Sequence, residues 1–191
     1  MASFCYHYVM SQKVILNIAV SLDGYVASSD DTIKWLESYD NLSEYGFNDF
    51  ISSVGAIIMG DRSYDIGIEN GWFQGNPYGP SPIFVVSSKK RSEDKAIGNF
   101  IFVKDGIEKT YELASLAAGD KNIYLFGGPN VVQQFINKNL LDEIHLSIAP
   151  VILGSGIPLF ANLEERSIEL DRTDVKAYSD GLTSIHFKVV K

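Results

Sequence analysis

Short apolar segments alternate with amphipathic ones over most of the chain. The apolar segments are rich in β-branched and aromatic residues, as is typical of strands buried on both faces of a sheet. They lie at 14–20, 56–59, 83–86, 100–103 and 123–126. Apolar residues at helical spacing predict helices over 42–53, 107–118 and 130–139, with Ser43 as the N-cap of the first. The glycine-, proline- and asparagine-rich stretch 64–82 predicts a long irregular connection.

The last quarter of the chain has a different pattern. Residues 143–153 predict one long strand, and 175–178 and 183–190 flank Ser179-Asp180-Gly181, a hairpin signal. Strands alternating with helices predict an α/β fold in three layers, with a mostly parallel central sheet covered on both faces. The hairpin adds an antiparallel edge at the C-terminus.

Composition narrows the class of protein. A chain of 191 residues suits one domain, and a single cysteine, Cys5, allows no intrachain disulfide, which fits the cytoplasm. No apolar run reaches the length of about 20 residues that a membrane helix needs, and residues 1–13 lack a signal-peptide pattern. The net charge of −8 argues against nucleic acid as a partner. One local exception, the basic cluster 87–91, is either a solvated loop or an anion site.

Three predicted strands end in residues suited to ligand binding. In parallel sheets, ligands bind beyond the carboxyl ends of the strands. The three ends read Gly60-Asp61-Arg62-Ser63, Ser87-Ser88-Lys89 and Gly127-Gly128-Pro129-Asn130. Glycine lets backbone approach a phosphate, and a helix start offers free N–H groups. The alternative is that Gly127-Gly128 is only a tight turn between a strand and a helix.

Other catalytic patterns are absent from the sequence. His145 and His186 fall within predicted strands and lack metal-ligand spacing, so no metal is expected. His145 is interpreted as a packed or partly exposed strand residue rather than a catalyst. The sequence contains no nucleophile elbow, no phosphate loop and no G-x-G-x-x-G fingerprint.

Five motifs in order carry a family resemblance. They are Ser21-Leu22-Asp23-Gly24-Tyr25, Ile58-Met59-Gly60-Asp61-Arg62-Ser63-Tyr64, Tyr124-Leu125-Phe126-Gly127-Gly128, Leu141-Asp142-Glu143-Ile144, and the stretch 150–160. In this order the chain resembles the dihydrofolate-reductase-like superfamily. It is most similar to the branch that contains the C-terminal reductase domain of the bacterial riboflavin-biosynthesis deaminase/reductase. The resemblance covers 14–191, which leaves 1–13 as an N-terminal extension.

The resemblance implies an NADPH-binding fold. Gly127 and Gly128 would let the following helix face the cofactor pyrophosphate, and Arg62 and Ser63 would lie near the adenosine phosphates. Ser87, Ser88 and Lys89 would contact the adenosine ribose or its phosphate. Ala19 and the segment 21–25 would border the nicotinamide and the substrate. The remaining implied cofactor-binding residues are Gly60, Phe126, Asn130 and Val131.

The chain departs from the family pattern at two positions. Asp61 stands where the family usually has arginine, which leaves the preference for NADPH over NADH open. The carboxylate that dihydrofolate reductases place on the first helix has Glu44 as its nearest counterpart, with Asp49 as another. Glu44 and Asp23 are therefore the candidate catalytic residues; alternatively, Glu44 is an acid favoured by the dipole of the helix start.

These features predict a stand-alone reductase, since the zinc-deaminase signatures of the riboflavin enzyme are missing. The predicted reaction is NAD(P)H-dependent hydride transfer to a pterin-like or phosphoribosylamino-pyrimidine substrate, as in 5-amino-6-(5-phosphoribosylamino)uracil reductase or dihydrofolate reductase. The alternative is a catalytically idle relative that kept the fold. A homodimer is expected through the apolar stretch 148–160, which could instead be intramolecular core.

Overall fold

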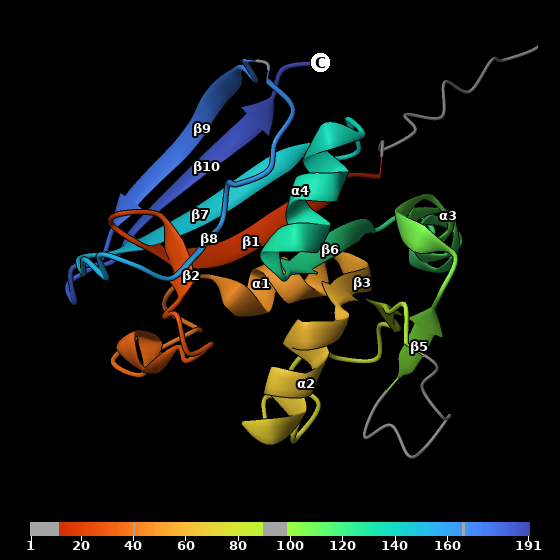
Figure 1. Cartoon of the computed structure of the whole chain (residues 1–191), viewed down its shortest axis with the longest axis horizontal. Coiled ribbons are helices and arrows are strands. Elements are labelled where there is room, and N and C mark those ends of the chain that lie inside the picture. Colours follow the sequence, from red (N-terminus) through yellow and green to blue (C-terminus); the bar gives the residue numbers. More distant parts are fainter. Residues whose placement is uncertain (1–11, 40, 90–98, 166) are drawn as a thin grey trace, which may run out of the picture.

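An eight-stranded sheet forms the centre of the computed structural model, which describes residues 12–39, 41–89, 99–165 and 167–191. Its strands lie in the order β5 (Phe100–Val103), β4 (Ile83–Val86), β3 (Val54–Gly60), β6 (Asn122–Gly127), β1 (Val14–Ser21), β7 (Glu143–Ala149), β10 (Thr183–Val189) and β9 (Leu170–Ala177). Neighbours from β5 to β7 are parallel, whereas β10 pairs antiparallel with both β7 and β9. The predicted α/β fold with an antiparallel C-terminal hairpin is thus confirmed (Figure 1).

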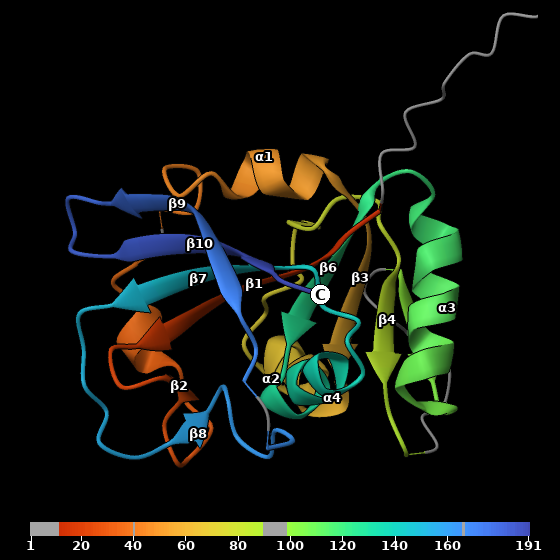
Figure 2. The same ribbon diagram turned by 90° about the horizontal axis from the view of Figure 1, so that it is seen from above.

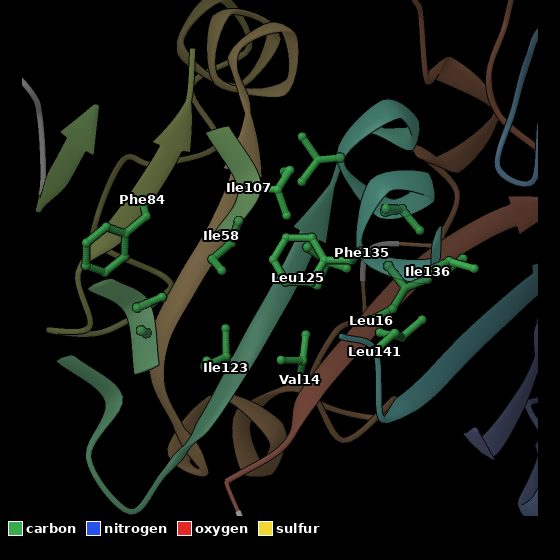
Figure 3. Close-up of a cluster of buried hydrophobic side chains, with 14 of the residues drawn as sticks. Val14, Leu16, Ile58, Phe84, Ile107, Ile123, Leu125, Phe135, Ile136 and Leu141 are labelled. Carbon is green, nitrogen blue, oxygen red and sulfur yellow. The ribbon is translucent and has the colours of Figure 1, made fainter. Parts of the chain in front are cut away.

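Helices cover both faces of this sheet. On one face, α3 (Gly106–Ala118) and α4 (Pro129–Asn137) bury a core in which Ile107 and Phe135 pack against strand residues such as Leu16, Ile58 and Leu125 (Figure 3). On the other face, α1 (Phe47–Ser52) and α2 (Asp61–Glu69) pack through aromatic side chains onto a second core. Each inner strand carries apolar residues on both faces, because both faces are covered.

Smaller elements join the end of β1 to the end of β7. Strand β2 (Tyr25–Ala27) pairs with β8 (Ile157–Pro158), and a 3₁₀ turn, η1 (Lys34–Leu36), follows β2. None of the helices in the described segments is long and apolar enough to cross a membrane.

The first predicted helix is shorter than its sequence pattern indicated. Helix α1 begins at Phe47, and its N-cap is Gly46 in the left-handed conformation with φ 77°, so the assignment of Ser43 as N-cap was wrong. Residues 42–46 form turns instead, in which the Gly46 and Phe47 amides donate to the Ser43 and Leu42 carbonyls. The spacing of apolar residues alone does not reveal that a glycine within the pattern adopts the left-handed conformation.

Three other boundaries also differ from the prediction. The strand predicted over 143–153 ends at Ala149, since Pro150 has no amide hydrogen for a strand ladder. The connection predicted over 64–82 contains most of α2, whose Gly67 is required because a Cβ there would lie 2.5 Å from the Phe73 ring. Strand β9 begins at Leu170, and its residues are all exposed, so charge masked the strand pattern.

Candidate functional site

Two helices begin side by side at the carboxyl ends of the neighbouring strands β3 and β6 (Figure 2). Their N-caps are Gly60 for α2 and Gly128 for α4, and neither helix start has a side-chain cap. A Cβ built on Gly60 would lie only 3.5 Å from the Gly128 amide nitrogen. Two uncapped helix starts this close combine their dipoles and amide groups, which is the arrangement that binds anions.

Glycine at the two N-caps keeps the space between the helix starts free of side chains. A Cβ on Gly128 would lie 2.9 Å from the Ser63 Oγ atom, and one on Gly60 would lie 3.1 Å from the Val131 Cγ2 atom. Gly127 has φ 132°, and the peptide bond between the two glycines is cis. The interpretation of Gly127-Gly128 as more than a tight turn therefore gains a structural reason: side chains would fill the space in front of α4.

A cavity of about 880 Å³ opens from these helix starts and runs along the face of the sheet that α1 and α2 cover. Gly127, Gly128 and Ser63 line one end. His145 and His186, on β7 and β10, also line it. Aromatic and aliphatic side chains make up much of the remaining wall, namely Ile33, Leu36, Tyr39, Leu42, Phe47, Phe50, Trp72, Tyr78, Tyr124 and Phe126. A volume of this size accommodates a cofactor-sized or drug-sized ligand.

The structure brings only part of the predicted cofactor-binding set to this cavity. The set that lines it comprises Ala19, Arg62, Ser63, Phe126, Gly127 and Gly128. The helix starts also contain Gly60, Asn130 and Val131, which do not line the cavity. Val131 is buried against Gly60, and the exposed Asn130 accepts a hydrogen bond from Gln134.

The Ser87–Lys89 segment follows β4 and lies outside the cavity lining, although it is connected to α2. Ser87 is buried, its Oγ accepts the Lys89 amide, and Ser88 is exposed. Lys89 Nζ lies 3.1 Å from an Asp61 oxygen and 3.8 Å from an Asp65 oxygen. The rest of the predicted basic cluster, residues 90 and 91, falls outside the described residues.

Arg62, like Lys89, is paired with a carboxylate. Arg62 Nη2 lies 2.6 Å from Asp31 Oδ2, and this hydrogen bond and the charge of Asp31 raise the pKa of the Arg62 guanidinium. Both Arg62 and Lys89 therefore carry carboxylate partners at the mouth of the helix-start site. Their positive charge is offset locally, so the site is much less cationic than its sequence indicated.

Neither predicted catalytic carboxylate lines the cavity. Glu44 is exposed in the turn before α1 and accepts a hydrogen bond from Asn41. Asp23 accepts hydrogen bonds from the Ser21 hydroxyl and from the Leu153 and Gly154 amides, which ties the end of β1 to the loop after β7. These contacts give Asp23 a positioning role in the loops. Asp49, the other alternative, is exposed on α1.

Two histidines on neighbouring strands line the cavity. The rings of His145 and His186 stack with centroids 3.8 Å apart and planes 8° apart. Burial, and then the charge of His186, lower the pKa of His145 to about 4. The interpretation of His145 as a packed or partly exposed strand residue did not include its contact with His186. A signal was present, because polar residues alternate at 143, 145 and 147 in an otherwise apolar strand.

Asp23→Ala is expected to destabilise the fold in a pH-dependent manner. The Ser21 hydroxyl and the two loop amides lower the pKa of the Asp23 carboxyl, so its ionised form stabilises the native state above its unfolded pKa of about 3.9. Thermal melts at pH 7 should show a lower Tm for Asp23→Ala than for the native chain. The difference should shrink as the pH falls through the folded pKa.

The matched control for this measurement is Asp120→Ala, which removes an exposed carboxylate from the turn after α3. Equal Tm changes for the two variants at pH 7, or a Tm difference for Asp23→Ala that does not depend on pH, would contradict the positioning role.

The comparisons with known proteins agree with this geometry. The family model of the RibD C-terminal domain matches residues 12–184. The chain is 31% identical over 185 residues to the uncharacterized protein YyaP of Bacillus subtilis, which covers 91% of this chain and 93% of that protein. It is 32% identical over 156 residues to YwjB of the same organism, covering 81% and 86% respectively.

A solved structure shares the fold over nearly the whole chain. The crystal structure of a candidate riboflavin biosynthesis protein from Shewanella sp. PV-4 superimposes with a TM-score of 0.81 at 26% identity, covering 94% of this chain and 100% of that one. The superfamily resemblance drawn from the five sequence motifs is thereby confirmed. The chain belongs to the RibD C-terminal domain family, with its dihydrofolate-reductase-like fold.

Proposed function

We propose that this protein is an NAD(P)H-dependent reductase that transfers a hydride to a ring compound related to pterins or to phosphoribosylamino-pyrimidines. One observation carries the proposal: the paired helix starts at Gly60 and Gly128 open into a cavity large enough for a ligand that extends beyond its phosphates. Family membership supports it, because the family is that of a reductase domain of riboflavin biosynthesis.

The residues present fit a dinucleotide. Gly127 and Gly128 leave open the space that a Cβ would fill, and Ser63 offers a hydroxyl beside it, so these residues would hold the pyrophosphate. The Ser87–Lys89 segment, tied to α2 through Asp61, would lie toward the adenosine ribose. Ala19 and Phe126 would border the nicotinamide. When bound, the reduced nicotinamide supplies a hydride, and the protein supplies position and electrostatics.

The rest of the cavity would hold the hydride acceptor. Aromatic side chains such as Tyr39, Phe47 and Phe50 form flat apolar walls, which suit a planar ring. Polar side chains come from β7 and β10 and offer hydrogen bonds to ring nitrogens and oxygens. This combination favours an electron-poor heterocycle with a C=N bond as the substrate class.

Gly128→Val is expected to abolish cofactor binding. The valine side chain would meet the Ser63 hydroxyl, since even a Cβ would lie 2.9 Å from its oxygen. Titration followed by nicotinamide fluorescence should show that the NADPH Kd rises by at least about 100-fold, in line with a fully blocked phosphate contact of about 3 kcal/mol.

Gln134→Ala is the control for this titration, because it changes the same helix outside the cavity lining. Unchanged NADPH affinity in a folded Gly128→Val variant would remove the pyrophosphate assignment. A native chain that does not bind NADPH at millimolar concentration would favour an idle relative of the family over a reductase.

The cofactor preference is expected to depend on Asp61. Its carboxylate offsets the charge of Lys89, so Asp61→Asn should free the ammonium group for the 2′-phosphate that distinguishes NADPH from NADH. The ratio of NADH Kd to NADPH Kd should rise by about tenfold, corresponding to about 1.4 kcal/mol. Lys89→Ala should change the ratio in the opposite direction. Equal changes in both affinities would show that Lys89 does not reach the 2′-phosphate.

We also propose that the chain forms a homodimer through an apolar surface defined by Leu22, Ile152 and Phe160. These side chains are 62%, 70% and 47% exposed, and the loops carrying Leu22 and Ile152 are joined by the hydrogen bond from the Leu22 amide to the Val151 carbonyl. The Leu159 amide donates to the Gly24 carbonyl, which brings the residue before Phe160 to the loop that carries Leu22. Large exposed apolar side chains gathered on neighbouring loops mark an interaction surface. The predicted stretch 148–160 contributes two of these side chains.

Sedimentation equilibrium at micromolar concentration should give twice the chain mass for the native protein and one chain mass for Ile152→Asp. Leu116→Asp, which changes an exposed leucine on α3, should remain a dimer. A native protein that sediments with the mass of one chain would overturn the proposal.

A further inference from the structure

The stacked histidines belong to a polar row that crosses three strands in register. Asn17 on β1 pairs with His145 on β7, and His145 pairs with His186 on β10. All three side chains line the cavity, whereas the residues of β7 and β10 on the opposite face pack against the apolar core. The row therefore faces the ligand space rather than solvent.

His145 contacts a carboxylate that is itself paired with a lysine. His145 Nε2 lies 3.4 Å from Glu143 Oε2, and Glu143 Oε1 lies 2.6 Å from Lys13 Nζ. Lys13 pairs with Glu143, and the Glu143 carboxylate is placed to accept an Nε2–H from His145. The stack, the carboxylate and the ammonium group thus orient the His145 ring and favour the tautomer with its proton on Nε2.

The surroundings of the pair allow it a single proton. The charged neighbours on the adjacent strands are Lys13 before β1, Glu143 on β7, Lys188 on β10, and Asp174 opposite His186 on β9. From α1, the Phe50 ring packs edge-on against His145, and Tyr124 on β6 packs against the same Phe50 ring. Two imidazolium rings 3.8 Å apart would repel each other strongly. His145 turns its Nε2 atom toward Glu143, whereas the described residues offer no hydrogen-bond partner to the His186 ring, so His186 is the ring that can present an N–H group to the ligand space.

Reduction of a C=N bond needs such a proton as well as a hydride. Among the described residues that line the cavity, Asp31, Arg62 and Glu143 are engaged in ion pairs. A phenol is a weak acid, with an ordinary pKa of about 10. Burial raises the pKa of Tyr78 to about 12 and raises that of Tyr124 as well, so the tyrosines of this wall are poor acids at neutral pH. The histidine pair is the group in this wall suited to donate a proton near pH 7.

We propose that the His145–His186 pair is the proton donor of the reductase, with His186 as the catalytic acid and Glu143 and Lys13 as positioning residues. The inference rests on the proposed function. A bound reduced nicotinamide would supply the hydride to the carbon of the substrate C=N bond, so that the π electron pair would go to the nitrogen. His186 would donate its N–H proton to that nitrogen, and the electron pair of the broken N–H bond would stay on the imidazole ring. The neutral His186 would regain a proton from solvent.

The proton inventory of the pair can be measured without a substrate. In ¹⁵N-histidine spectra of the full chain with NADPH bound, assigned through His145→Asn and His186→Asn, the pair should take up one proton between about pH 5 and pH 8, on the His186 ring. His145 should stay neutral as the Nε2–H tautomer over that range, and Glu143→Gln should disturb this tautomer. Two independent titrations in that range, or a His186 that stays neutral throughout it, would overturn the proposal.

Turnover tests the catalytic step itself. With 5-amino-6-(5-phosphoribosylamino)uracil and 7,8-dihydrofolate as the probe acceptors, His186→Asn should lower kcat on the order of 100-fold, as loss of a general acid does. Its NADPH Kd should stay within about twofold, since the paired helix starts are untouched. The kcat of the native enzyme should fall as the pH rises and the pair loses its proton, and His186→Asn should lack that dependence.

Arg172→Gln, on the exposed edge strand β9, is the matched control and should keep native kcat and pH profile. Native turnover in His186→Asn would remove the histidine pair from the mechanism while leaving the reductase proposal intact. A native chain that binds NADPH but oxidises it with neither acceptor would instead overturn the reductase proposal for these substrates, and the proton-donor proposal with it.

Discussion

The close approach of two backbones at Gly60 and Gly128 is the constraint on which the site depends. Strands β3 and β6 are parallel neighbours, so their helices begin at the same edge of the sheet. Because neither N-cap has a side chain, the space between the two helix starts stays open. The same pair of glycines therefore leaves an open, electropositive place between two helix dipoles.

One face of the central sheet carries the main buried core, and the other face carries the cavity. The face under α3 and α4 is closed by side chains such as Phe135 and Leu125, and it supplies the main buried core. The face under α1 and α2 is closed by a second, largely aromatic cluster over β5, β4, β3 and β6. Toward β7 and β10 it carries polar residues and the cavity. The apolar core thus holds the strands in the register that aligns Asn17, His145 and His186.

Charges around the cavity are arranged as local pairs. Arg62 is matched with Asp31, Lys89 with Asp61, and Lys13 with Glu143. Because the partners are half exposed, each pair contributes little to stability, and its main effect is on the local field. The pairs offset the positive charge of the cations at the helix starts, and in the opposite part of the wall Lys13 and Glu143 lie beside His145.

The sequence by itself determined the class of fold and the place of the helix-start site. Runs such as 56–59 and 123–126 are apolar on both faces and end in glycine, and strand pattern and glycine chemistry are both local properties of the chain. It did not determine the start of α1, where a left-handed glycine interrupts an apolar helical pattern.

Only the tertiary structure decided which polar groups meet in the cavity. Glu44 and Asp23 are conspicuous in the sequence but are bonded elsewhere, whereas His145 and His186 stand far apart in the chain and meet only through the antiparallel register of β7 and β10. The physical reason is that side-chain contacts between strands depend on register and pairing partner, which the strand pattern of each segment does not specify.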